Sequence, residues 1–176
     1  ELAGEIALKL QLEQQHYAIE VNLENSYIHQ QNELFSIDKL SGVIGWTTMT
    51  KPVLSKVQWQ DASVYAIPLG SSSIKAEVQS SSLLLLEPLN LPILDGAITL
   101  NDFNLQRQQD ARLEWAFKGE VKPISMELLS STLGWPLLHG KLSGEIPSVS
   151  YSERQIKIEG ALKVNLFEGT TIIRDL

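Results

Sequence analysis

The side chains that could carry out chemistry are few and far apart in this sequence. Its three histidines, His16, His29 and His139, have no partner at metal-ligand spacing. The chain of 176 residues also has no cysteine, which excludes disulfides, thiolate catalysis and thiolate metal sites. We therefore predict no metal site and no cofactor.

The carboxylates do not suggest acid–base catalysis either. Glu20 and Glu24 could form a pair, but four residues along a strand separate them by about 13 Å. Asp95, before a glycine, and Asp110 are typical of turns. The motifs of serine hydrolases, zinc proteases and phosphate-binding loops are missing from the sequence. We predict that the protein is not an enzyme.

Charge and hydropathy exclude further classes. The net charge of −7 disfavours nucleic acid as a partner, because phosphate binding needs a basic surface. The longest apolar run, Leu83 to Leu86, is far shorter than the ~20 residues of a membrane-spanning helix. The chain begins at Glu1 without an initiator Met, so we expect a fragment of a longer protein.

Apolar and polar residues alternate along most of the chain, as strands require. Residues 4–13 and 17–24 form two such runs around a break at Gln14-Gln15, which predicts a hairpin with one apolar face. Trp115 and Phe117 share a strand face and are candidates for lining a ligand site. We predict a mainly β fold: a single β-rich domain over residues 1–176, with possible sub-units 1–120 and 121–176.

One segment has the spacing of a helix. Ser125 is placed to cap a first turn, leucines recur at helical spacing, and Gly134 followed by Pro136 ends the pattern. We expect one short α-helix near residues 125–133, packed on the sheet.

The block from Ile124 to Leu176 resembles the AsmA-like and TamB-like superfamily of bacterial envelope proteins, and within it the YdbH-like branch. The features that carry the resemblance are the short helix ending at Leu133-Gly134, and then Gly140-x-Leu142-x-Gly144-x-Ile146-Pro147-x-Val149 and Gly160-x-Leu162-x-Val164-x-x-Phe167-x-Gly169. The first 120 residues share only the texture of strands.

The resemblance implies a long, curved antiparallel sheet forming an open groove or U-shaped half-barrel with an apolar inner face. It further implies a periplasmic protein, anchored in the inner membrane by an N-terminal helix, that helps to pass phospholipid to the outer membrane. The residues expected to line the groove and contact acyl chains are Leu8, Leu10, Leu12, Ile19, Val21, Leu23, Trp115, Phe117, Leu162, Val164 and Leu166.

Two other functions remain open. The sheet could be a structural scaffold of the cell envelope that docks on an outer-membrane or periplasmic protein by strand addition. A dicarboxylate-transport component, as some family labels suggest, would need basic side chains that converge on a pocket. The basic residues are scattered along the sequence: Lys51, Lys56, Arg107, Arg112, Lys118, Lys122 and Arg154.

Overall fold

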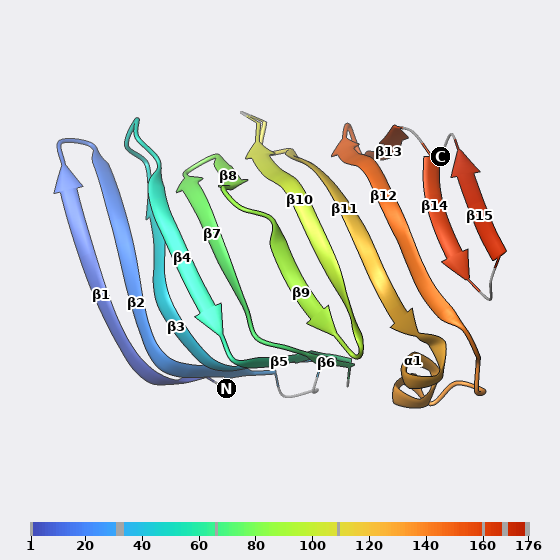
Figure 1. Cartoon of the computed structure of the whole chain (residues 1–176). Coiled ribbons are helices and arrows are strands. Elements are labelled where there is room, and N and C mark those ends of the chain that lie inside the picture. The colour runs from blue at the N-terminus through green and yellow to red at the C-terminus, as the bar shows by residue number, and fades with distance from the viewer. Residues whose placement is uncertain are drawn as a thin grey trace.

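The computed structural model shows a chain made almost wholly of antiparallel strands, with one short helix (Figure 1). The structure describes residues 2–30, 34–65, 67–108, 110–159, 161–166 and 169–174; within these ranges the side chains of 2, 161–164, 166 and 171–174 are not described. The mainly β prediction is therefore confirmed.

The strands follow one another along the sheet mostly as hairpins. The elements are β1 (Leu2–Glu13), β2 (His16–His29), β3 (Phe35–Thr47), β4 (Val53–Trp59), β5 (Asp61–Val64), β6 (Ile67–Leu69), β7 (Ser72–Gln79), β8 (Ser82–Leu85), β9 (Leu89–Ile93), β10 (Gly96–Arg107), β11 (Leu113–Ser125), α1 (Met126–Leu133), β12 (Lys141–Ser152), β13 (Gln155–Glu159), β14 (Ala161–Leu166) and β15 (Gly169–Arg174).

The prediction of an open groove or U-shaped half-barrel is wrong. The strand pairings form a closed circuit, β3–β4–β7–β8–β10–β9–β6–β5 and back to β3. In its order of hydrogen-bonded neighbours the sheet thus closes into an eight-stranded barrel. β2 and β1 extend it beyond β3, and β11, β12, β14 and β15 extend it beyond β10.

Short interruptions within three strand-forming runs permit this closure. Gln60 separates β4 from β5, Gly70 and Ser71 separate β6 from β7, and residues 86–88 separate β8 from β9. Each half of a run can then pair with a different neighbour, so β4 pairs with β7 while β5 pairs with β6. Figure 1 shows β5 and β6 crossing the lower end of the sheet towards β9.

The predicted first hairpin is confirmed. β1 and β2 pair antiparallel with Leu8 opposite Val21, across a two-residue turn in which Gln14 adopts a positive φ of 53°. Register shifts lie between Ala3 and Glu5 in this pair and between Leu23 and Ser26 in the next. Such bulges bend a sheet, and the lower ends of β1, β2 and β3 curve together in Figure 1.

The predicted helix is also confirmed, but its start differs from the expectation. α1 ends at Gly134, which adopts the left-handed conformation with φ 67°. The Ser125 hydroxyl makes no capping bond to the helix. It donates instead to Asp95 Oδ2 at 2.6 Å, and the Ser125 N–H donates to Asp95 Oδ1 at 2.7 Å, so the turn before β10 holds the helix start.

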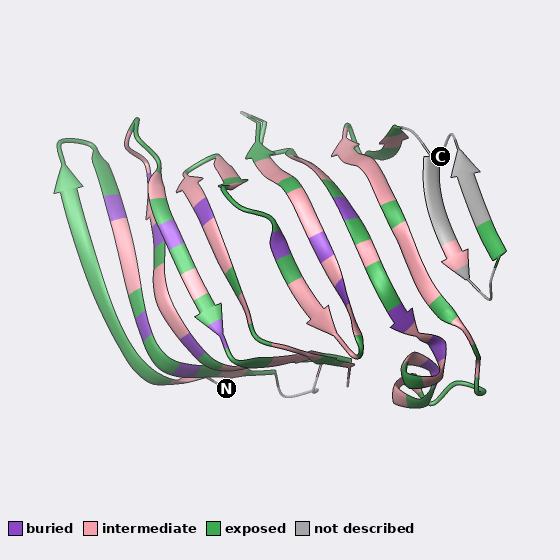
Figure 2. Ribbon diagram, in the orientation of Figure 1, coloured by how far each residue is buried: buried purple, intermediate pink, exposed green. Residues whose placement is uncertain are grey.

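The core is small for a chain of this length. Among the described residues, its buried cluster consists of Leu23, Leu40, Trp59 and Leu89. Figure 2 shows buried residues as isolated bands along the strands, with half-buried residues around them. A sheet with little packed against it leaves hydrophobic side chains partly in contact with water.

Candidate functional site

One side of the sheet carries hydrophobic side chains from strand to strand. In the first three strands Leu8 lies opposite Val21, and Val21 lies opposite Ile44. Leu10, Ile19 and Trp46 form a parallel row one pleat away. Because register partners project from the same side of a sheet, these six side chains share one surface. We call this side of the sheet the apolar face.

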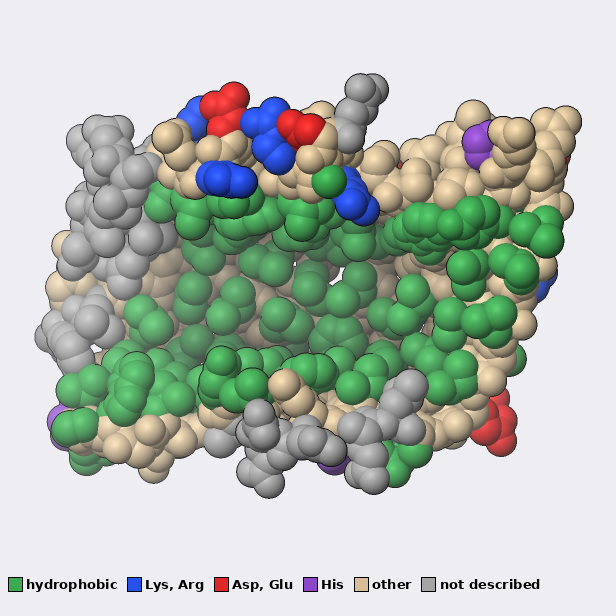
Figure 3. All heavy atoms as spheres, turned by 180° about the vertical axis from the view of Figure 1, so that it is seen from behind, with side chains coloured by type: hydrophobic (Ala, Val, Ile, Leu, Met, Phe, Trp, Pro, Cys, Tyr) green, Lys and Arg blue, Asp and Glu red, His purple; other side chains and the backbone are tan. Residues whose placement is uncertain are grey.

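The longest apolar row crosses seven strands. Its members are consecutive register partners on β4, β7, β8, β10, β11, β12 and β13, namely Val53, Val78, Leu83, Leu105, Trp115, Tyr151 and Ile156. Six steps of ~4.8 Å between neighbouring strands give a length of about 29 Å. Figure 3 shows the result, a face covered by hydrophobic side chains between polar borders.

Three aromatic rings stand together on this face. The Trp115 ring stacks on Tyr151 with centroids 5.7 Å apart and an interplanar angle of 14°, and on Phe117 at 5.8 Å and 28°. Trp115 and Tyr151 are register partners, whereas Trp115 and Phe117 are next neighbours on one side of β11. The stack gives this part of the face a flat, rigid surface.

The chain as a whole exposes more surface than a compact monomer does, and part of the apolar face is strongly exposed. The chain exposes 11482 Å² of surface, whereas a compact protein of 19.6 kDa would expose ~8,600 Å². On the apolar face, Leu8 is 69% exposed and Ile44 43% exposed. Large contiguous apolar surfaces of this kind mark sites where another apolar molecule binds.

The structure brings most of the predicted lining residues together in two groups. Leu8, Leu10, Leu12, Ile19, Val21 and Leu23 lie on the apolar face of β1 and β2. The side chain of Leu23 differs from the other five in being buried, as a member of the core cluster. Trp115 and Phe117 lie on the same face of β11. The side chains of Leu162, Val164 and Leu166 lie outside the described residues.

Sequence reasoning missed much of the apolar face. Ile44, Val78, Leu83, Leu105 and Tyr151 belong to it through their register partners. Val78, Leu105 and Tyr151 stand in alternating runs, so their signal was present, whereas Leu83 opens the continuous apolar run Leu83 to Leu86 and has no such signal. Assigning these residues to one face needed the pairing of strands that are far apart in the sequence, for example Trp115 with Tyr151.

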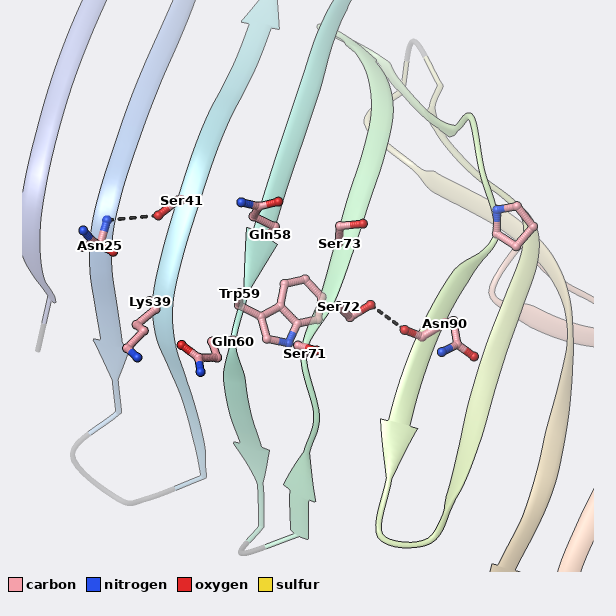
Figure 4. Close-up of a pocket in the computed structure, with 11 residues that line it drawn as sticks. Asn25, Lys39, Ser41, Gln58, Trp59, Gln60, Ser71, Ser72, Ser73 and Asn90 are labelled. Atoms are coloured by element: carbon pink, nitrogen blue, oxygen red, sulfur yellow. Dashed lines mark hydrogen bonds between the residues drawn. The ribbon is translucent and has the colours of Figure 1, made fainter.

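The other side of the sheet holds a polar hollow of about 620 Å³ (Figure 4). Its lining is mostly amides and hydroxyls, with Lys39 as its one charged side chain: Asn25, Lys39, Ser41, Gln58, Trp59, Gln60, Ser71, Ser72, Ser73, Pro88 and Asn90. Trp59 is 9% exposed and its Nε1–H donates to the Gly70 carbonyl at 3.2 Å, so its ring offers no open stacking platform. This hollow has no carboxylate for acid–base chemistry.

The perturbed carboxylates are explained by local structural bonds. Hydrogen bonds from Ser125 lower the pKa of Asp95, and the side chain of Lys75 lowers the pKa of Glu87. His139 Nδ1 lies 3.0 Å from Glu127 Oε1 at the end of the loop after α1. In the described part of the chain no group of three His, Cys, Asp or Glu residues could hold a metal ion.

Comparisons with family models, with curated proteins and with solved structures found no match to this chain. The resemblance of residues 124–176 to the AsmA-like and TamB-like superfamily therefore stays a prediction. No helix among the described residues has the length and hydropathy needed to cross a membrane. The apolar face is thus the feature on which a functional proposal has to be built.

Proposed function

We propose that this chain binds the acyl chains of phospholipids on its apolar face, as a module of a membrane-anchored periplasmic protein that helps to transfer lipid between the inner and outer membranes. The observation that carries the binding proposal is the unbroken apolar row from Val53 to Ile156 across seven strands. The location and the transfer rest on the resemblance of residues 124–176 alone.

The energetics of such a surface favour long hydrocarbon chains. Each methylene that leaves water contributes ~0.8 kcal/mol, so an acyl chain of 14 methylenes half covered by the face gains about 5–6 kcal/mol. No specific polar contact is required for this gain. The head group can stay in water at the border of the face, where Figure 3 shows polar and charged side chains.

The uniform chemistry of the face also suits movement along it. The row Leu8–Val21–Ile44 at one end of the sheet and the row Leu105–Trp115–Tyr151 farther on present similar hydrocarbon surfaces. Sites of similar free energy permit a bound chain to shift from one to the next without an energy source in this chain. This is the physical basis of the proposed transfer.

The test is native mass spectrometry with lipid extraction on the protein purified from bacteria without detergent. We expect phospholipid to co-purify, and to be lost when Val21→Asp or Phe117→Asp places a charge on the apolar face. Leu54→Asp is the matched control, because Leu54 lies on the polar side of β4 and pairs with Glu77. Lipid-free wild-type protein that is folded and monomeric would refute the proposal.

A second function, docking on a partner in the cell envelope by strand addition, is favoured by β1. This strand of twelve residues pairs only with β2 among the described strands, so its other edge offers unpaired backbone groups. The double variant Ala7→Lys and Gln11→Lys charges this edge while sparing the apolar face. A second copy of the protein can stand in for the partner, so sedimentation velocity over a hundredfold range of concentration should show self-association through this edge in the wild type and none in the double variant.

A further inference from the structure

A hollow of about 400 Å³ lies between the turn that joins β10 to β11 and the turn that joins β12 to β13. Two arginines, two acids and three other residues line it: Asp110, Ala111, Arg112, Leu113, Tyr151, Glu153 and Arg154. The two turns are about forty residues apart in the sequence, so only the pairing of β11 with β12 brings the arginines to one place.

The hollow opens on the end of the apolar face. Its apolar members are Leu113 and Tyr151, and Tyr151 stacks on Trp115, its neighbour in the longest row. Arg107 ends β10 directly opposite Leu113, which adds a third cation at this border. Figure 3 shows Lys or Arg and Asp or Glu side chains along one rim of the apolar face. Apolar side chains and basic side chains therefore lie next to one another at this border.

Arg112 is held in a defined orientation. Its Nε lies 2.5 Å from Asp110 Oδ2, and its backbone N–H donates to Asp110 Oδ1 at 3.1 Å. This bond occupies Nε only, and in the part of the chain that the structure describes no residue accepts from the two terminal nitrogens. A guanidinium fixed in this way presents its remaining N–H groups as a fork that fits phosphate oxygens.

Arg154 occupies a strained backbone position. Glu153 and Arg154 have φ values of 53° and 62°, which makes them the two central residues of a tight turn between the paired residues Ser152 and Gln155. Asn-Gly would be preferred in such a turn, because side chains disfavour positive φ. The turn fixes the backbone of Arg154 at the tip of the β12–β13 hairpin, beside the turn that carries Arg112.

From this geometry we propose that Arg112 and Arg154 bind the phosphate of a phospholipid head group at the rim, while its acyl chain lies on the apolar face along Tyr151 and Trp115. This inference rests on the proposed function. It adds a specific phosphate-binding site at one border of the apolar face, whose chemistry is otherwise uniform. A lipid would bind there with its phosphate at the rim and its hydrocarbon directed along the row.

The experiment compares ligands that share one acyl chain. Lysophosphatidylethanolamine, lysophosphatidylglycerol and the uncharged monoacylglycerol are titrated against a bound fluorescent fatty acid, below the concentrations at which they form micelles. We expect both phosphate-bearing lipids to bind at least tenfold more tightly than monoacylglycerol. In the double variant Arg112→Gln and Arg154→Gln this preference disappears, while the affinity for monoacylglycerol changes less than twofold.

Two further variants distinguish the effect of the planar guanidinium groups from the effect of net charge. Lys118→Gln with Lys122→Gln removes the same charge from the polar side of β11, where both lysines are exposed, and should leave the preference intact. Arg112→Lys with Arg154→Lys keeps the charge but not the planar fork, and should recover part of the preference. Circular dichroism confirms that each variant is folded.

The outcomes distinguish this inference from the function on which it rests. Equal affinity for all three ligands would overturn the phosphate site and leave acyl-chain binding in place. No binding of any ligand would overturn both. Full displacement by 10 mM inorganic phosphate would show a site for the free anion, and displacement by succinate a dicarboxylate site; either result would overturn the lipid head group as its occupant.

Discussion

A single charge on an apolar row should interrupt lipid binding without unfolding the protein. Ile44 is the best position, because it is 43% exposed and follows Leu8 and Val21 in their row. Since this side chain is only about half buried, Ile44→Asp removes about half of the ~2–3 kcal/mol that full burial provides. We expect the free energy of unfolding to fall by about 1–2 kcal/mol, which includes the poor strand propensity of Asp.

The effect on lipid binding should be larger. A carboxylate on the apolar face keeps its hydration shell, so the nearest methylenes of a bound chain cannot cover it. The loss of contact at six half-covered methylenes, three on either side of the carboxylate, at ~0.4 kcal/mol each amounts to about 2.4 kcal/mol, or a roughly 50-fold weaker Kd. The loss of about 1–2 kcal/mol in the free energy of unfolding should leave the protein folded, so the weaker Kd can be measured on folded protein.

The assay is displacement of a fluorescent fatty acid by a long-chain phospholipid, with thermal unfolding measured in parallel. Leu54→Asp is the control, because Leu54 is 52% exposed and lies on the opposite side of the sheet, with Glu77 as its register partner. We expect this control to lose similar stability and no affinity. Equal affinities of the two variants would refute the assignment of the apolar face as the binding surface.

Three further predictions concern stability and the aromatic stack. Gly42→Ala should destabilise the fold by about 2–4 kcal/mol and lower Tm by about 5–15 °C, because Gly42 has φ 135° and an added Cβ would clash with the backbone of β4. Hydrogen bonds from the hydroxyl and the N–H of Ser125 lower the pKa of Asp95 below its usual 3.8. The ionised carboxylate therefore stabilises the fold above about pH 4, and this stabilisation is lost as the pH falls through the folded-state pKa. Asp95→Asn should reduce the loss of stability on the acid side of the pH–stability curve. A phospholipid with brominated acyl chains should quench the fluorescence of Trp115 more than that of Trp135, measured in variants that keep one tryptophan each, because Trp135 lies in the loop after α1.

Each of these has an outcome that would contradict it. An unchanged Tm in Gly42→Ala would show that the backbone there relaxes without cost. Acid unfolding of Asp95→Asn that follows the wild-type curve would remove this carboxylate from the pH dependence. Equal quenching of the two tryptophans would place the acyl chain away from the aromatic stack.

The local elements could be predicted from the sequence because their signals are local. The alternation of residues 4–13 and 17–24 specified the first hairpin and its apolar side, and the structure confirms both. The helix ended at Gly134 as expected, because a left-handed residue followed by proline stops a helix. The role of the Ser125 hydroxyl could not be predicted, because its acceptor Asp95 is thirty residues away in the sequence and comes close to Ser125 only through the β9–β10 turn.

The sequence by itself determined which residues alternate, and hence that the protein is mainly β with many apolar side chains along its strands. Only the tertiary structure decided how the sheet closes and what meets at its borders. The eight-stranded circuit depends on pairings such as β6 with β9, and the two arginines at the rim come from separate turns. Periodicity along a strand reports which side chains share a face, whereas hydrogen-bonded register between distant strands sets which faces and turns become neighbours.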